Sequence, residues 1–246
     1  MQQDLIEEQH SPGKSLLLHL LPGILIGFVY FAFLPYFHQR GYPSMMALMT
    51  ADLLILVPFE LGYLLYLGKQ KNGRFSLKGI VYYRKPIPVW QYFIWVPALF
   101  LVVGIIFTLL KPVDVFLKNT LFAWMPPIES GLQGGFSKST LIVTYGMVAV
   151  FGAVLGPTVE EFYFRGYLLP RMKYAGKWAS LLHSFLFALY HIFTPWMLVT
   201  RTLGMLPIVY AVKRSNLYVG IIVHILVNFI DVIVGIGFIM GMAGTS

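Results

Sequence analysis

The sequence predicts an all-α fold: a polytopic transmembrane helical bundle of about 7–8 helices that encloses a polar cavity. Two observations carry this prediction. Of the 246 residues, 58% are hydrophobic and only 11% are charged, whereas soluble domains carry about 25% charged residues. Several segments also reach the roughly 20 apolar residues that cross a bilayer as a helix. The chain is therefore expected to be an integral, multi-pass membrane protein in contact with membrane lipid.

The expected elements follow from the apolar runs in chain order. Short connections between these runs indicate a single membrane-embedded domain over residues 1–246. The spans are expected at about 16–37, 45–67, 91–110, 139–156, 178–194, 196–212 and 217–242, with an eighth helix at about 157–174 whose depth the sequence leaves open.

Gly156-Pro157 ends one of these apolar runs. Proline removes a backbone N–H and often ends or kinks a helix, and Thr158 directly after it is an acceptable N-cap. We therefore expect a helix break here, with Glu160 and Glu161 in the first turn of the helix that follows.

The net charge of +8 is concentrated in the connection 68–89, which holds no acidic residue. Positive charge gathers on the cytoplasmic side of membrane proteins. The rule places this loop and the N-terminus in the cytoplasm and the loop 111–138 outside. An odd number of spans puts the C-terminus outside as well. Nucleic acid is not an expected partner. The basic residues of the loop are Lys69, Lys71, Arg74, Lys78, Arg84 and Lys85.

Two further observations bound the class of protein. The N-terminal segment 1–14 is acidic and lacks the basic region and the cleavage site of a secretory signal peptide. The chain has no cysteine, which excludes disulfides, thiolate catalysis and metal sites with Cys ligands. The compact chain favours the plasma membrane of a bacterium or an archaeon.

Glu160, Glu161 and Arg165 carry charge next to strongly apolar segments, where an ionised side chain costs about 2.5–3.5 kcal/mol on insertion scales. Glu161 and Arg165 are four residues apart and share one helix face, so a structural ion pair explains them. Glu160 points about 100° away around the helix. It is therefore the better candidate for a general base.

Two later segments carry histidine at helical spacing. His183 and His191 lie on one stripe of a helix, and His224 and Asn228 are again four residues apart. Hydrogen bonding between helices explains such residues equally well. We interpret His183 as structural and retain His191, His224 and Asn228 as candidates.

Other charged residues lie in or near the apolar runs. A structural role is the favoured interpretation for Asp52, Glu60 and Arg201, although Glu60 could face Arg201 or a water-filled cavity. Asp231 could anchor a neighbouring helix or face the same cavity.

The candidates form a coherent set for hydrolysis. A carboxylate such as Glu160 can take a proton from water and return it to a leaving amine, and His191 could orient that water. His224 and Asn228 could donate hydrogen bonds to an oxyanion. Motifs of other intramembrane proteases, such as H-E-x-x-H for zinc or G-x-S-x-G for a serine nucleophile, are missing from the sequence.

Three motifs occur in order: EEFYFR at 160–165, FALYH at 187–191 and HILVN at 224–228. They match the patterns EExxxR, FxxxH and HxxxN. In these motifs the chain resembles the CPBP family of intramembrane proteases, which includes Rce1-type CAAX prenyl endopeptidases and bacterial Abi proteins. The resemblance covers a motif-bearing core of about 140–235.

The resemblance implies about eight helices around a conical cavity. It further implies that Glu160 activates water together with His191, that His224 and Asn228 build the oxyanion site, and that Glu161 and Arg165 support them. No cofactor is favoured. If a metal is used, zinc is possible, with Glu160, His191 and His224 as its ligands.

The leading hypothesis is an intramembrane endopeptidase that cleaves a peptide bond near the cytoplasmic side of the bilayer. Its partner would be a peptide or membrane-protein substrate, with or without a prenyl group. The alternatives are a non-catalytic membrane scaffold of the bacteriocin-immunity type and a proton-coupled transporter.

The expected spans place two of the candidate catalytic residues at different depths in the membrane. His191 would lie about 20 Å into the span 178–194 at 1.5 Å per residue, whereas Glu160 would sit near the cytoplasmic rim. We expect the break at Gly156-Pro157 to bear on how the two side chains meet.

Overall fold

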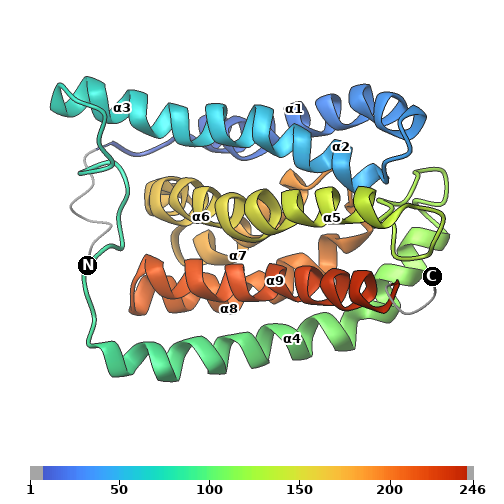
Figure 1. The fold of residues 1–246 in the computed structure, drawn as a ribbon. Helices are drawn as coiled ribbons and strands as arrows, with labels where there is room; N and C mark the ends of the chain where they lie inside the picture. The colour runs from blue at the N-terminus through green and yellow to red at the C-terminus, as the bar shows by residue number, and fades with distance from the viewer. Residues whose placement is uncertain (1–7, 243–246) are drawn as a thin grey trace.

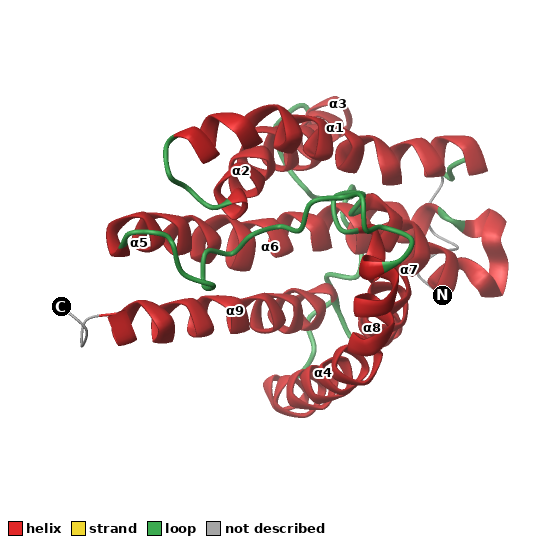
Figure 2. Cartoon of the chain, turned by 90° about the vertical axis from the view of Figure 1, so that its right-hand side faces the viewer, coloured by secondary structure: helices red, strands yellow, loops and turns green. Residues whose placement is uncertain are grey.

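The computed structural model describes residues 8–242, and every regular element among these residues is a helix. The long helices run roughly parallel or antiparallel to one another in layers (Figures 1 and 2). In both views α1, α2 and α3 form one outer layer, α5, α6 and α7 lie in the middle, and α4 forms the opposite edge beside α8. The predicted polytopic helical bundle is confirmed.

Some of the long helices are built from consecutive pieces with different hydrogen-bond spacing. Within residues 8–242, six continuous helices are long and apolar enough to cross a membrane, at Pro12–Gln39, Ser44–Asn72, Val89–Asn119, Lys138–Arg171, Pro195–Arg214 and Leu217–Gly241. The helical pieces are α1 (Pro12–Gln39), α2 (Ser44–Ala51), η2 (Asp52–Leu61), α3 (Gly62–Asn72), α4 (Val89–Asn119), α5 (Lys138–Met147), η3 (Val148–Leu155), α6 (Gly156–Glu160), η4 (Glu161–Leu168), η5 (Leu169–Arg171), η6 (Lys173–Trp178), α7 (Ala179–Tyr190), η7 (Pro195–Met197), α8 (Leu198–Arg214) and α9 (Leu217–Gly241).

The predicted helix break at Gly156-Pro157 is wrong. Both residues lie inside one helix that continues from Lys138 to Arg171, and the hydroxyl of Thr158 donates to the carbonyl of Val154 instead of capping a new helix. The π-helical piece η3 ends at Leu155, two residues before Pro157. A π turn changes the carbonyl partner of each N–H and so eases the clash that proline makes in a regular α-helix. The expected eighth helix at 157–174 is the continuation of the span before it.

The expected full span at 178–194 is also wrong. α7 has 12 residues and rises about 18 Å, less than the roughly 30 Å of a hydrocarbon core. The chain then turns at His191, where the N–H of Thr194 donates to the carbonyl of His191, and returns as α8. The tip of this α7–α8 hairpin therefore lies inside the bundle.

These two corrections remove the conflict of depth. Glu160 lies 11 residues before Arg171, the end of its helix, or about 17 Å along the axis. His191 lies 12 residues beyond the first residue of α7, or about 18 Å. Because Arg171 and α7 are joined by the short segment 172–178, the two side chains reach similar depth from the same end of the bundle.

The two ends of the bundle differ in charge, although Arg40, Lys118 and Lys138 lie at the less basic end. We call the end that holds the loop 73–88, the segment 172–178 and the turn 215–216 the basic end, and the end that holds the loop 120–137 the less basic end (Figure 1). The loop 120–137 contains no Lys or Arg. The two ends of the described chain lie at opposite ends of the bundle (Figure 1). Residues 1–7, which form half of the acidic N-terminal segment 1–14, and residues 243–246 lie outside the described residues.

Two glycines allow close contacts of α1 with α7 and of α9 with the helix that carries Glu160 and Glu161. A Cβ on Gly23 of α1 would clash with the backbone carbonyl oxygen of Tyr190, the last residue of α7. On α9, a Cβ at Gly220 would lie 2.9 Å from Oε2 of Glu161. Small residues of this kind allow close packing of membrane helices. They fix α7 and α9 against their neighbours and so position the histidines that these helices carry.

Candidate active site

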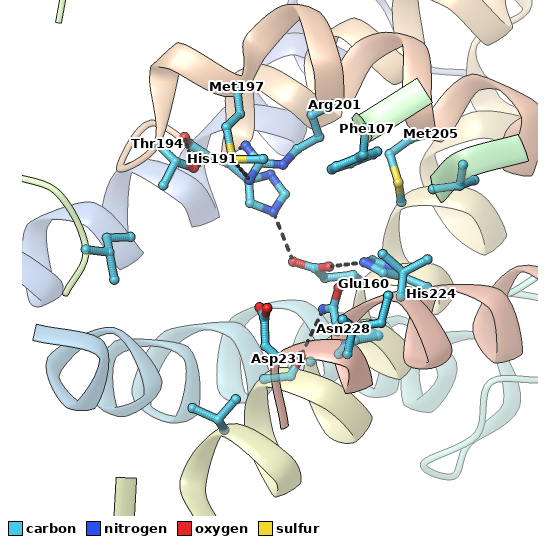
Figure 3. A pocket seen from close by; sticks show the side chains of 18 of the residues that line it. Phe107, Glu160, His191, Thr194, Met197, Arg201, Met205, His224, Asn228 and Asp231 are labelled. Carbon is cyan, nitrogen blue, oxygen red and sulfur yellow. Dashed lines mark hydrogen bonds and ion pairs between the residues drawn. The ribbon is translucent and has the colours of Figure 1, made fainter. Parts of the chain in front are cut away.

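The structure brings the four predicted catalytic side chains to one cavity of about 970 Å³. Glu160 ends α6, His191 follows the last residue of α7, and His224 and Asn228 lie on α9. All four line the cavity (Figure 3). Residues from three separate segments of the chain therefore converge as the motifs predict.

Glu160 lies between the two imidazoles. Its Oε1 is 3.9 Å from Nε2 of His191 and its Oε2 is 3.7 Å from Nε2 of His224 (Figure 3). Both separations exceed a direct hydrogen bond but lie within the reach of one bridging water. Glu160 as a residue is 7% exposed and lines the cavity.

The hydrogen bonds of His191 define its tautomer. Its Nδ1 lies 2.9 Å from the backbone carbonyl of Phe187, and a carbonyl oxygen can only accept. Nδ1 therefore carries the proton, and Nε2 of a neutral His191 is an acceptor that faces Glu160. This position follows from the end of α7, because His191 has left the helical conformation with φ −82° and ψ 55°.

Glu161 and Arg165 form the predicted ion pair on the protein side of the site. Nη1 of Arg165 lies 3.2 Å from Oε1 of Glu161, and both side chains are fully buried. The same carboxylate oxygen accepts from Nδ1 of His224 at 3.0 Å. The guanidinium also lies 3.8 Å above the ring of Phe187, an arrangement that stabilises a desolvated cation. Glu161 and Arg165 thus hold His224 from behind and do not line the cavity.

Asn228 is anchored to the helix that carries Glu160. Its Nδ2 donates to the carbonyl of Gly152 at 2.9 Å. Because an amide nitrogen carries two hydrogens, one N–H remains for a ligand in the cavity.

His183 occupies a different environment. Its ring is fully buried, and its Nδ1 lies 3.0 Å from Nε2 of His19 on α1. The Nδ1 of His19 lies in turn 2.7 Å from the carbonyl of Ser15. This hydrogen-bonded pair joins α1 to α7, in keeping with the interpretation of His183 as structural.

Sequence reasoning undervalued the other charged residues of the cavity. Asp52, Arg201 and Asp231 all line it, whereas Glu60 is fully buried and does not. The guanidinium of Arg201 donates to the hydroxyl of Thr194 at 3.1 Å and forms no ion pair within residues 8–242. The available signal was an ionisable residue inside an apolar span, which by itself indicates function.

The candidate metal ligands are Glu160, His191 and His224. Within the part of the chain that the structure describes, no group of three or more His, Cys, Asp or Glu residues is placed to hold a metal ion. The Nδ1 atoms of both histidines are engaged in hydrogen bonds, as is usual for histidines that bind a metal through Nε2. Each Nε2 lies 3.7–3.9 Å from a carboxylate oxygen of Glu160. This separation accommodates a bridging water and is also close to that of two ligands bound at about 2.0–2.2 Å to one zinc ion.

Fold and site together define an integral membrane protein with a cavity inside its helical bundle that is lined by several ionisable side chains. A family model, described as type II CAAX prenyl endopeptidase Rce1-like, matches residues 142–230. The match supports the CPBP family of CAAX proteases and confirms the resemblance that the three motifs predict over this segment. No curated protein and no solved structure matches the chain.

Proposed function

We propose that the protein is an intramembrane endopeptidase in which Glu160 activates water for hydrolysis of a peptide bond. One observation carries this proposal: both oxygens of Glu160 lie within 4 Å of an imidazole nitrogen, one from His191 and one from His224, inside a cavity large enough for a peptide segment. The match of residues 142–230 to a family of proteases gives independent support for an enzyme with a peptide or protein substrate in the membrane.

In the proposed first step, Glu160 removes a proton from a water held between its Oε1 and Nε2 of His191. The water oxygen forms a bond to the carbonyl carbon of the substrate, and the π electrons of the carbonyl move to its oxygen. The free N–H of Asn228 and Nε2–H of His224 donate to this oxyanion. The C–N bond then breaks, and Glu160 returns its proton to the leaving amine.

The scheme requires a hydrogen on both ring nitrogens of His224. Its Nδ1 lies 3.0 Å from Oε1 of Glu161 and its Nε2 lies 3.7 Å from Oε2 of Glu160. The ring therefore lies between two carboxylates, and an opposite charge nearby offsets part of the cost of burying an imidazolium. The hydrogen on Nε2 is the one that the oxyanion would accept.

We further propose that the hydrolysis needs no metal and that the basic end faces the cytoplasm, which places the N-terminus there too. The orientation is supported by the basic residues at one end and by their absence from the loop 120–137. The proposal also includes a peptide or membrane-protein substrate, with or without a prenyl group. It places the protein in the plasma membrane of a bacterium or an archaeon.

Cleavage by the purified protein tests the proposal. A peptide library and a prenylated reporter should be incubated with the wild type, with Glu160→Gln and with Glu60→Gln, each with and without a chelator. Glu60 offers a control because it is a buried glutamate on another helix that does not line the cavity. We expect a loss of at least about 10²-fold for Glu160→Gln, near wild-type rates for Glu60→Gln, and no effect of the chelator.

Two results would contradict the proposal. Full turnover by Glu160→Gln would eliminate this carboxylate as the base, and loss of turnover with the chelator would overturn the metal-free scheme. A wild type that cleaves neither substrate set while retaining its fold would favour the non-catalytic scaffold.

A further inference from the structure

Arg201 is the only Lys or Arg side chain that lines the cavity among the described residues. It belongs to α8, inside one of the candidate membrane spans. In Figure 3 it lies beside His191, whereas Asp231 lies beside Asn228 on the far side of Glu160. A cation within a membrane span is costly, so it usually has an ionic partner or a function. The proposed hydrolysis does not use this charge.

No carboxylate of the described chain contacts the guanidinium of Arg201. The ion pairs within residues 8–242 do not include it. Asp114 on α4 accepts a hydrogen bond from the hydroxyl of Thr200, the residue before Arg201, at 2.6 Å and does not line the cavity. Glu160 instead lies 3.7 Å and 3.9 Å from the two imidazoles. A direct ionic partner for Arg201 would therefore have to come from a ligand.

Uncharged acceptors hold the guanidinium at the edge of the cavity. Its Nη1 donates to the hydroxyl of Thr194 at 3.1 Å, and its Nη2 donates to the sulfur of Met197 at 3.6 Å. These two bonds leave other N–H groups of the guanidinium, which has five. Phe107 and Met205 line the cavity next to it (Figure 3). An anion that enters here meets an oriented donor in apolar surroundings, where a charge-assisted hydrogen bond is strong.

The acidic residues of the cavity favour the same position for an anion. Asp52, Glu160 and Asp231 all line the cavity. A carboxylate that approaches one of these side chains meets a like charge, and such repulsion selects between binding positions. Arg201 therefore offers the most favourable position in the lining for a negatively charged group.

We propose that Arg201 binds a carboxylate of the substrate and so selects which peptides are cleaved. The inference rests on the proposed function and deepens it by naming the substrate class: peptides that carry a carboxylate within reach of Arg201 when the scissile bond lies at Glu160. A peptide C-terminus and an Asp or Glu side chain present the same pair of oxygens to a guanidinium. Arg201 thus determines specificity and takes no part in the proton transfers.

Binding of short peptides tests the inference without requiring cleavage. Three Ala/Leu peptides with a fluorescent N-terminal label serve as probes. The first has a free C-terminus, the second an amidated C-terminus and one Glu, and the third an amidated C-terminus with Gln in place of that Glu. Each is added to the Glu160→Gln protein in a non-ionic detergent without anionic lipid, so that lipid phosphates do not compete for the guanidinium.

Arg201→Gln and Arg201→Lys are tested in the same background, with Arg214→Gln as the matched control. Arg214 is an exposed residue at the end of the same helix and does not line the cavity. Its substitution removes the same charge from α8. Thermal unfolding of each variant, with and without the bound peptide, separates loss of binding from loss of fold.

We expect at least one acidic peptide to bind about tenfold or more tightly than the Gln peptide, as a hydrogen bond to a charged group allows. Arg201→Gln should abolish this preference and Arg214→Gln should retain it. Arg201→Lys should weaken it, because lysine cannot form the bidentate pair. Preference for the free C-terminus or for the Glu peptide identifies the source of the carboxylate, and either supports the proposal.

Three results would overturn the proposal. The first is equal binding of all three peptides, or binding of none. The second is a preference for the acidic peptide that survives Arg201→Gln or, if that variant does not fold, is undiminished in Arg201→Lys. The third is an equal loss of affinity for all three peptides in Arg201→Gln, which would assign Arg201 to the structure of the turn at Thr194.

Cleavage of matched acidic and amidated substrates separates this inference from the proposed function. In the protein with Glu160 intact, the ratio of kcat/KM for the acidic peptide to that for its Gln counterpart should fall about tenfold or more with Arg201→Gln and should not change with Arg214→Gln. Turnover without any preference for the carboxylate would leave the proposed function standing and overturn the role of Arg201. Selective binding of the acidic peptide without turnover would leave the carboxylate site standing and overturn the proposed function.

Discussion

The packed face and the cavity-lining face of one helix place the adjacent residues Glu161 and Glu160 in contrasting surroundings. On the packed face, Glu161 is fully buried and contacts Arg165 and His224. On the cavity face, Glu160 lies 3.7 Å and 3.9 Å from the two imidazoles and makes no direct side-chain hydrogen bond within residues 8–242. A carboxylate that has its partners stabilises the fold, and one that lacks them is available to a ligand. The face of the helix on which each glutamate lies therefore decides whether its carboxylate can reach a ligand in the cavity.

The largest expected effect follows from breaking the buried pair. Glu161→Ala leaves Arg165 without a carboxylate in a fully buried position, and removal of one partner from a buried pair costs about 3–5 kcal/mol. We expect a clear fall in the unfolding temperature, measured by thermal denaturation in detergent. Glu160→Ala is the matched control on the adjacent residue and should unfold close to the wild type while losing turnover. The reverse pattern would exchange the roles of the two glutamates.

The sequence predicted which side chains lie together better than it predicted the helices that hold them. The three motifs select Glu160, His191, His224 and Asn228 as one group, and the structure places all four at one cavity. The helix boundaries failed at Pro157 and at α7. Neither a π turn before the proline nor a helix that ends halfway through the bilayer changes the apolar composition, which is the only signal of a span.

The contribution of the N-terminal half was also hidden from the sequence. Its helices carry no motif, yet Met45 and Asp52 line the cavity and His19 holds His183. Such contacts join residues about 100 or more positions apart. They depend on how the layers pack, which the periodicity of a single helix does not encode.

The next largest effect concerns the oxyanion. Asn228→Ala removes one donor, and loss of a single oxyanion-hole donor costs about 10²–10³-fold in kcat. We expect kcat to fall while KM changes little, since the interaction is made in the transition state. Asp231→Ala, one turn along the same helix, should leave kcat within a few-fold of the wild type. An effect of Asn228→Ala on KM alone would assign the residue to substrate binding.

Close packing of α1 against α7 gives a smaller effect. A Cβ at Gly23 meets the carbonyl of Tyr190, so Gly23→Ala forces the two helices apart. Overpacking of this kind costs about 1–3 kcal/mol, and it should also lower kcat because Tyr190 directly precedes His191. Gly13→Ala on the same helix meets no neighbour within 4 Å and should match the wild type in thermal unfolding and in turnover. Equal effects in both variants would mean that helix propensity, not packing, is responsible.

The smallest expected effect concerns the basic end, where His10 packs against Tyr167. Burial, together with the nearby charges of Lys14 and Arg171, lowers the pKa of His10 to about 4. An unfolded chain with an ordinary histidine pKa near 6.5 binds more protons between these values, so stability is full above about pH 6.5 and declines as the pH falls toward 4. His10→Gln should flatten this part of the unfolding-temperature profile, and the exposed His38→Gln should not. A profile unchanged by His10→Gln would show that the stability of the fold does not depend on a neutral His10 at the basic end.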